Sequence, residues 1–167
     1  MLYALGASLV LGAVMTFGDW IWAVLGLRHR VAYGLAHGAL MCLCLGTAIG
    51  YRERRTSIGV AAGPLIGLVA ASSFYLLAPW LRLWAMFPAW MLFWICFAFL
   101  QARLRREPAG SAIAVGVVAA ILSGVAFYSI SGIWTRHTPG GPNYAWNLIA
   151  WTWAFLPGFA ALFWKRR

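Results

Sequence analysis

The most regular feature of the chain is a series of long apolar segments separated by short polar or proline-containing stretches. A bilayer core of about 30 Å needs roughly 20 apolar residues per helix, which is close to the length of each segment. Six are expected, at Leu2–Val24, Val31–Gly50, Ser57–Leu77, Trp84–Gln101, Ala109–Ile133 and Tyr144–Trp164. The pattern predicts an all-α, polytopic integral membrane protein, with six transmembrane helices in one compact bundle and a single domain over residues 1–167.

Composition supports a lipid environment. Hydrophobic residues make up 63% of the 167 residues and charged residues only 10%, and the mean hydropathy is +0.81. Soluble domains carry about 25% charged residues. The polar surface is therefore too small to cover a water-facing shell, and six spans leave no room for a soluble catalytic domain.

The basic residues lie at the ends of the apolar segments, where membrane proteins place them. If the loops alternate sides, nine of the thirteen fall on one side: Arg52, Arg54, Arg55, Arg103, Arg105, Arg106, Lys165, Arg166 and Arg167. The other side holds four: Arg28, Arg30, Arg82 and Arg136. The positive-inside rule then predicts cytoplasmic N- and C-termini, in a membrane of the bacterial inner type. The formal charge of +10 is spread over these ends rather than gathered in one patch, so no nucleic-acid partner is expected.

Glycines recur four residues apart on the second and third segments. They are Gly34, Gly38, Gly46 and Gly50 on the second, and Gly59, Gly63 and Gly67 on the third. Lipid provides no hydrophobic drive between helices, so small residues that allow close backbone contact hold them together. We expect these two helices to meet along their glycine faces.

Asp19 is the only acid inside an apolar segment, and His37 is the only histidine inside one. At 1.5 Å per residue they lie roughly 9 Å and 5 Å outward of their segment centres, so they could face each other. An unpaired carboxylate inside a bilayer costs at least ~2.5–3.5 kcal/mol, so Asp19 needs a partner or a wet cavity. His37, Arg28 and Arg30 are the candidate partners. The alternative is an interfacial acid that holds the basic turn, without a cavity.

Other polar side chains fall in the same outer half, and tryptophans lie deeper. We therefore predict a central cavity, enclosed by the first, second, third and fifth spans, that opens toward the outer face and binds an apolar, lipid- or sterol-like ligand. The predicted ligand-binding residues are Asp19, His37, Tyr75, Tyr128 and Asn147 at the mouth and Trp94, Trp151 and Trp153 as walls. The expected partners are membrane lipids, an apolar small molecule and, in one alternative, another membrane protein.

Catalytic signals are weak. The sequence carries no recognisable metal-ligand spacing and no nucleophile motif, so no catalytic residue, metal or cofactor is predicted. Cys42 and Cys44 are two residues apart, which suits neither a disulfide nor a shared metal. An Asp19–His37 couple could transfer protons, which leaves a transporter or channel component open. Haem ligation by His37 and a helix-packing subunit of a larger complex are further alternatives.

The last two segments resemble those of the Insig family. The similarity rests on Tyr128, the Gly132-Ile133-Trp134-Thr135 stretch, Pro139 and Trp146, with a basic loop before and a basic tail after. The resemblance implies a six-span protein with cytoplasmic termini that binds sterol or a diacylglycerol-like lipid in a central cavity. Asp19 and the Arg28-His29-Arg30 turn depart from that family's pattern.

Overall fold

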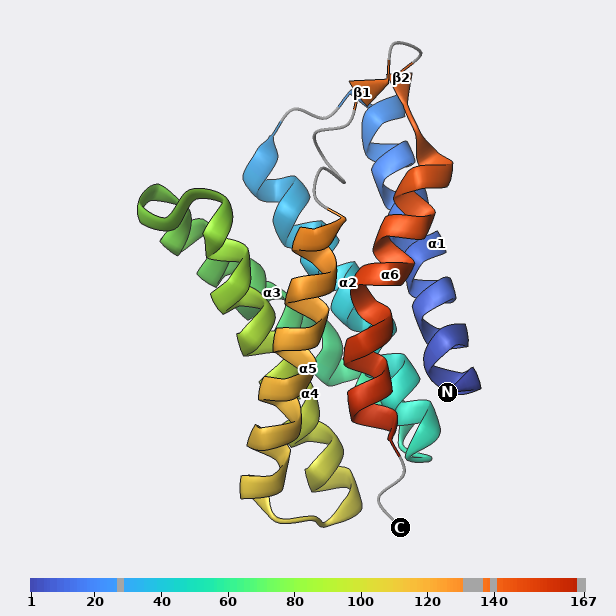
Figure 1. Ribbon diagram of the computed structural model, residues 1–167, viewed down its shortest axis with the longest axis vertical. Coiled ribbons are helices and arrows are strands. Elements are labelled where there is room, and N and C mark those ends of the chain that lie inside the picture. The colour runs from blue at the N-terminus through green and yellow to red at the C-terminus, as the bar shows by residue number, and fades with distance from the viewer. Residues whose placement is uncertain (27–28, 131–136, 139–140, 165–167) are drawn as a thin grey trace.

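Six helices form the described part of the chain, which in this computed structural model comprises residues 1–26, 29–130, 137–138 and 141–164 (Figure 1). They are α1 (Leu2–Val24), α2 (Arg30–Arg52), α3 (Thr56–Leu81), α4 (Met86–Arg105), α5 (Ala109–Ser129) and α6 (Tyr144–Phe163). A 3-10 turn, η1 (Arg82–Ala85), precedes α4, and a two-residue ladder joins β1 (His137–Thr138) to β2 (Gly141–Pro142). All six helices are long and apolar enough to cross a bilayer. The predicted all-α, six-span integral membrane fold is confirmed.

Three helix ends differ from the sequence prediction by four residues, and two of them are the end of α4 at Arg105 rather than Gln101 and the end of α5 at Ser129 rather than Ile133. The third helix was expected to end at Leu77, before Pro79, but α3 continues to Leu81. Proline lacks one N–H group and is costly mainly in a helix interior; here α3 ends two residues beyond it. The reversal falls at Arg82, whose φ of 51° closes α3 and leads into η1.

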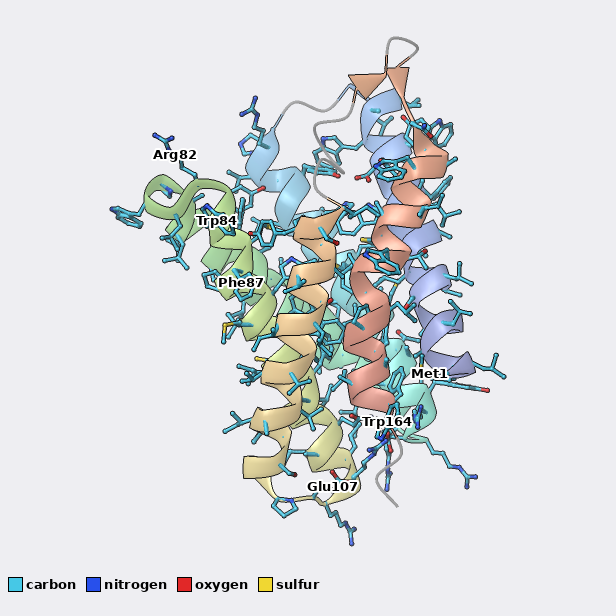
Figure 2. All side chains as sticks on the ribbon, viewed as in Figure 1. Met1, Arg82, Trp84, Phe87, Glu107 and Trp164 are labelled. Carbon is cyan, nitrogen blue, oxygen red and sulfur yellow. The ribbon has the colours of Figure 1, made fainter. Side chains whose placement is uncertain are left out.

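The chain runs up and down, so alternate connections gather at opposite ends. The N-terminus, the α2–α3 turn and the α4–α5 turn lie at one end, and the β1–β2 ladder and the α3–α4 turn lie at the other (Figure 1). Figure 2 shows Arg82 and Trp84 at the second end and Glu107 at the first. Trp80, Trp84 and Trp164 are exposed near helix ends, as an interfacial aromatic belt requires.

The glycine faces of α2 and α3 meet in close backbone contact. A Cβ added to Gly46 would overlap the carbonyl oxygen of Gly59 and lie 3.0 Å from Gly63 Cα. A Cβ on Gly67 would lie 2.7 Å from the carbonyl carbon of Gly38. No larger side chain fits at these positions without moving the backbone. The predicted contact between the two glycine faces is confirmed.

An aromatic core occupies the other side of the bundle, between α4, α5 and α6. Its rings are Trp90, Phe93, Trp94, Phe97, Phe127, Trp151, Phe155 and Phe159, all buried. Trp90 stacks on Phe155 with ring centroids 4.9 Å apart. Ser123 of α5 donates a hydrogen bond to the carbonyl oxygen of Ala154, which ties α5 to α6. This core fixes α6 so that Trp151 reaches toward α2.

A polar network ties the helices together at the end that holds the N-terminus. The Glu53 carboxylate, directly after α2, accepts hydrogen bonds from Arg105 at 2.5 and 2.9 Å and from Gln101 at 3.0 Å. Arg52 donates to the carbonyl oxygen of Phe163 at 2.9 Å. Burial alone would raise the pKa of the Glu53 carboxyl, but these hydrogen bonds and the charges of Arg105 and Arg52 outweigh it and lower the pKa.

Candidate functional site

A cavity of about 340 Å³ lies between α2, α3 and α4, in the half of the bundle away from the N-terminus, and Trp151 of α6 also lines it. Ligand pockets commonly have volumes of about 300–1,000 Å³. Most of its lining is apolar and includes Met41, Ala70, Phe74, Met86, Trp90 and Phe93. Its polar contributors are Arg30, Tyr33, His37 and Tyr75. The cavity thus combines an apolar body with a polar rim.

Helical spacing explains the α2 wall of the cavity. Tyr33, His37 and Met41 are four residues apart and therefore share one face of α2. Gly34 lies beside this face, and a Cβ there would overlap the Tyr75 hydroxyl. With no side chain in the way, Tyr75 of α3 crosses to α2 and donates a 2.7 Å hydrogen bond to the carbonyl oxygen of Arg30.

Asp19 of α1 lies directly behind this wall and joins three helices. The Tyr33 hydroxyl donates to Oδ1 of Asp19, and the indole Nε1 of Trp151 donates to Oδ2 at 3.2 Å. Nδ1 of His37 lies 3.7 Å from Oδ1. We refer to Asp19, Tyr33, His37 and Trp151 as the Asp19 cluster. The expected proximity of Asp19 and His37 is found, but the direct hydrogen bonds come from Tyr33 and Trp151.

The ring of His37 is held between two aromatic rings. Its centroid lies 5.0 Å from that of Tyr33 and 5.4 Å from that of Trp151. The side chain is 11% exposed, and its Nε2 atom is buried without a hydrogen-bond partner among the described residues. A buried polar atom left without a hydrogen bond is costly, so native proteins keep few of them. Nε2 has almost no accessible surface, so it is enclosed by the protein rather than exposed in the cavity.

The surroundings of Asp19 also test the alternative that it is an acid at the membrane interface that holds the basic turn, without a cavity. The side chain is only 12% exposed, and both of its oxygens accept hydrogen bonds from inside the bundle. Of the candidate arginine partners, Arg28 lies outside the described residues, and Arg30 contributes its carbonyl oxygen to Tyr75. This geometry fits a structural role within the bundle better than an acid that only holds the basic turn.

The structure brings His37, Tyr75 and Trp151 to the cavity, with Asp19 behind them, and distributes the other predicted residues elsewhere. Trp94 is fully buried in the aromatic core, 5.8 Å from Phe159 between ring centroids. Tyr128 packs on Trp84 with ring centroids 5.1 Å apart. Asn147 lies in the first turn of α6, and Trp153 is 51% exposed on the outer surface. None of these four lines the cavity.

Sequence reasoning missed Tyr33, the donor to Asp19. The signal was present, because Tyr33 precedes His37 by four residues and must share its helix face. It also missed α4 as a wall of the cavity. The expected enclosure used the first, second, third and fifth spans, whereas Met86, Ala89, Trp90 and Phe93 of α4 line the space instead.

A second, larger groove of about 590 Å³ lies at the opposite end, between α4, α5 and α6. Small side chains such as Ala112 and Ala160 form much of its wall. Gln101 and Arg105, two of its polar side chains, are already bonded to Glu53. These two polar side chains of the groove are therefore engaged in the network around Glu53.

Comparison with other proteins identifies no relative. The residues on which the Insig resemblance chiefly depends, Gly132 to Thr135 and Pro139, lie outside the described residues, and the resemblance stays a prediction. Among the described residues, no three His, Cys, Asp or Glu side chains lie close enough to share a metal ion. The chain matches no protein-family model, no curated protein and no solved structure.

Proposed function

We propose that this integral membrane protein binds an apolar, lipid-like ligand in the cavity between α2, α3 and α4. The observation that carries the proposal is the combination of an apolar cavity body with a polar rim of Arg30, Tyr33, His37 and Tyr75. An amphipathic lipid presents the same combination, with an apolar body and a polar end. Sterol or diacylglycerol-like lipid, the class that the Insig resemblance implies, fits this description.

The proposal includes a membrane orientation. The described residues at the N-terminal end include six arginines, Arg52, Arg54, Arg55, Arg103, Arg105 and Arg106. Under the positive-inside rule this end is cytoplasmic, in a membrane of the bacterial inner type. The cavity then lies in the outer half of the bilayer, where a lipid of the outer leaflet can reach it.

A proton relay through Asp19 and His37 is the second candidate, and the 3.7 Å approach of Nδ1 to Oδ1 favours it. A relay needs further proton carriers toward the opposite face. Toward that face, α1 and α2 carry the buried apolar residues Leu11, Met15 and Leu45 and the hydroxyl groups of Ser8 and Thr16, and neither helix has a further acid or histidine there. Proton flux in proteoliposomes that depends on pH would support a relay over a binding role.

A cavity-filling variant tests the binding proposal. Ala89 of α4 is 5% exposed and lines the cavity, so Ala89→Phe places a ring in the space that the ligand would occupy. Ala36→Phe is the matched control, because Ala36 is exposed on α2 and does not line the cavity. Both variants and the wild-type protein are reconstituted in nanodiscs containing the total lipid extract of the expression host.

Native mass spectrometry then counts bound lipids after the nanodisc is stripped. The wild-type protein and Ala36→Phe are expected to retain a lipid-like adduct, and Ala89→Phe is expected to lose it at least tenfold. Equal retention by all three proteins, or a wild-type protein without any adduct, would contradict the proposal. Thermal unfolding of each variant separates loss of the ligand from loss of the fold.

A further inference from the structure

The lining of the cavity between α2, α3 and α4 narrows the class of ligand, an inference that rests on the proposed function. On α2 the lining begins at Arg30, the first residue of the helix, and reaches Met41. These two residues are 11 positions apart, or about 16 Å at 1.5 Å per residue. The hydrocarbon core of a bilayer is about 30 Å thick, so one leaflet contributes about half of it. The lining therefore spans about the depth of one leaflet.

The lining is polar at one end and apolar at the other. Arg30 and Tyr75 meet at the end of the bundle away from the N-terminus, where the Tyr75 hydroxyl donates a hydrogen bond to the carbonyl oxygen of Arg30. Toward the middle of the bundle the lining continues with Met41, Ala70 and Phe93. A lipid that follows this lining has its head group at Arg30 and its chain between the apolar side chains.

Among the residues of the rim, Arg30 has side-chain donors to spare. The Tyr33 hydroxyl donates to Asp19, and the Tyr75 hydroxyl donates to the backbone of α2. The Arg30 side chain is exposed, and its guanidinium makes no hydrogen bond or ion pair with any residue that the structure describes. A guanidinium presents its N–H groups as a planar fork that matches a phosphate or a carboxylate.

No acid beside the cavity offsets the charge of Arg30. The chain has three acids, and two of them, Glu53 and Glu107, belong to the turns at the opposite end. The third, Asp19, does not line the cavity, and both of its oxygens accept hydrogen bonds within the bundle. The mouth of the cavity is therefore positively charged, and an anionic head group complements it.

We infer that the ligand is an anionic amphiphile, whose phosphate or carboxylate pairs with the guanidinium of Arg30 while its chain occupies the cavity. The long stem of an arginine can lie along apolar surface while its head stays at the membrane interface, where lipid head groups lie. A neutral sterol or diacylglycerol would fill the apolar body but leave the guanidinium unpaired. The charge of the head group is thus expected to set specificity.

Lipid pairs that differ only in the anionic group test the inference. One pair is a phosphatidate and the diacylglycerol with the same two chains, and the other is oleate and oleyl alcohol. Binding of each lipid is titrated by native mass spectrometry for the wild-type protein, Arg30→Gln, Arg30→Lys and Arg82→Gln. Arg82 provides the matched control, because it is exposed at the same end of the bundle and does not line the cavity (Figure 2).

At least one anionic lipid is expected to bind the wild-type protein about tenfold more tightly than its neutral counterpart, the value of a charge-assisted hydrogen bond. Arg30→Gln should lose this preference, Arg30→Lys should keep part of it, and Arg82→Gln should keep all of it. A preference within the phosphatidate pair alone identifies a phospholipid, and one within the oleate pair alone identifies a fatty acid. Arg30→Gln should unfold at the wild-type temperature, because the guanidinium has no partner among the described residues to lose.

The outcomes separate this inference from the proposed function. Equal binding of the anionic and neutral lipids to the wild-type protein overturns the inference and leaves lipid binding in the cavity intact. An anionic preference that survives in Arg30→Gln, or that is lost equally in Arg82→Gln, overturns the role of Arg30. Anionic binding that is unchanged in Ala89→Phe places the lipid outside the cavity and also overturns the inference. Binding of none of the four lipids, together with no lipid adduct in nanodiscs, overturns both.

Discussion

Replacing Gly63 by alanine tests whether α2 and α3 are as close as their backbones indicate. A Cβ at Gly63 would lie 3.0 Å from both the Cys42 carbonyl carbon and Leu43 Cα, and closer still to the Cys42 carbonyl oxygen. Ordinary contacts begin at 3.4 Å, so these backbone atoms must retreat by about 0.4 Å and the oxygen by more. A backbone carbonyl within a helix cannot rotate aside, so the two helices must separate.

The cost of this separation can be bounded. A gap of about 0.5–1 Å forfeits a quarter to a half of each contact energy along the affected interface, and overpacking typically costs about 1–3 kcal/mol. The exchange of glycine for alanine within a helix offsets about 0.5–1 kcal/mol of this loss. Gly63→Ala is therefore expected to lower the free energy of unfolding by roughly 1–2 kcal/mol.

The matched control is Gly6→Ala on α1, because a Cβ at Gly6 meets nothing within 4 Å. Both variants are unfolded reversibly in mixed micelles of dodecyl maltoside and increasing SDS, with tryptophan fluorescence as the signal. Gly6→Ala should be as stable as the wild-type protein or slightly more stable, and Gly63→Ala should be less stable. Equal stability of the two variants would refute the close glycine contact.

Two further predictions concern the polar contacts. Tyr33→Phe removes a donor to the Asp19 carboxylate and should lower the free energy of unfolding by about 1–3 kcal/mol. The control is Tyr51→Phe, at a tyrosine that is 69% exposed, which should leave the free energy of unfolding unchanged. Similar losses of stability in both variants would contradict the contact with Asp19. The pKa of Glu53 is lowered in the folded protein, so the wild-type protein should lose stability as pH falls below the ordinary value of 4.5. Glu53→Gln should be less stable than the wild-type protein at neutral pH, because it lacks the ion pair with Arg105. Its free energy of unfolding, measured from pH 3 to 7, should also change less with pH than that of the wild-type protein. Parallel pH profiles of the two proteins would rule out the contribution of Glu53.

Much of the fold could be predicted from local patterns. The length of each apolar segment determines a span, and the four-residue spacing of Gly59, Gly63 and Gly67 places them on one helix face. The similar depths of Asp19 and His37 along neighbouring spans predicted that the two side chains lie close together. These inferences succeeded because each uses only helix geometry and the thickness of a bilayer.

The walls of the cavity could not be predicted in the same way. Every span is apolar, so hydropathy does not say which helices lie beside one another; that depends on the shapes of packed side chains such as Trp94 over Gly158. One error was avoidable. Trp151 and Trp153 were both expected as walls, but residues two apart point to nearly opposite sides of a helix. Trp151 is buried and Trp153 is exposed accordingly.

The most direct test of lipid binding is an experimental density map of the wild-type protein in nanodiscs made with lipids of its expression host. The account predicts elongated non-protein density between α2, α3 and α4, in contact with Trp90, with its polar end at the rim that Arg30, Tyr33 and Tyr75 form. Closed packing of these three helices with no density between them, or lipid density confined to the outer surface of the bundle, would contradict it.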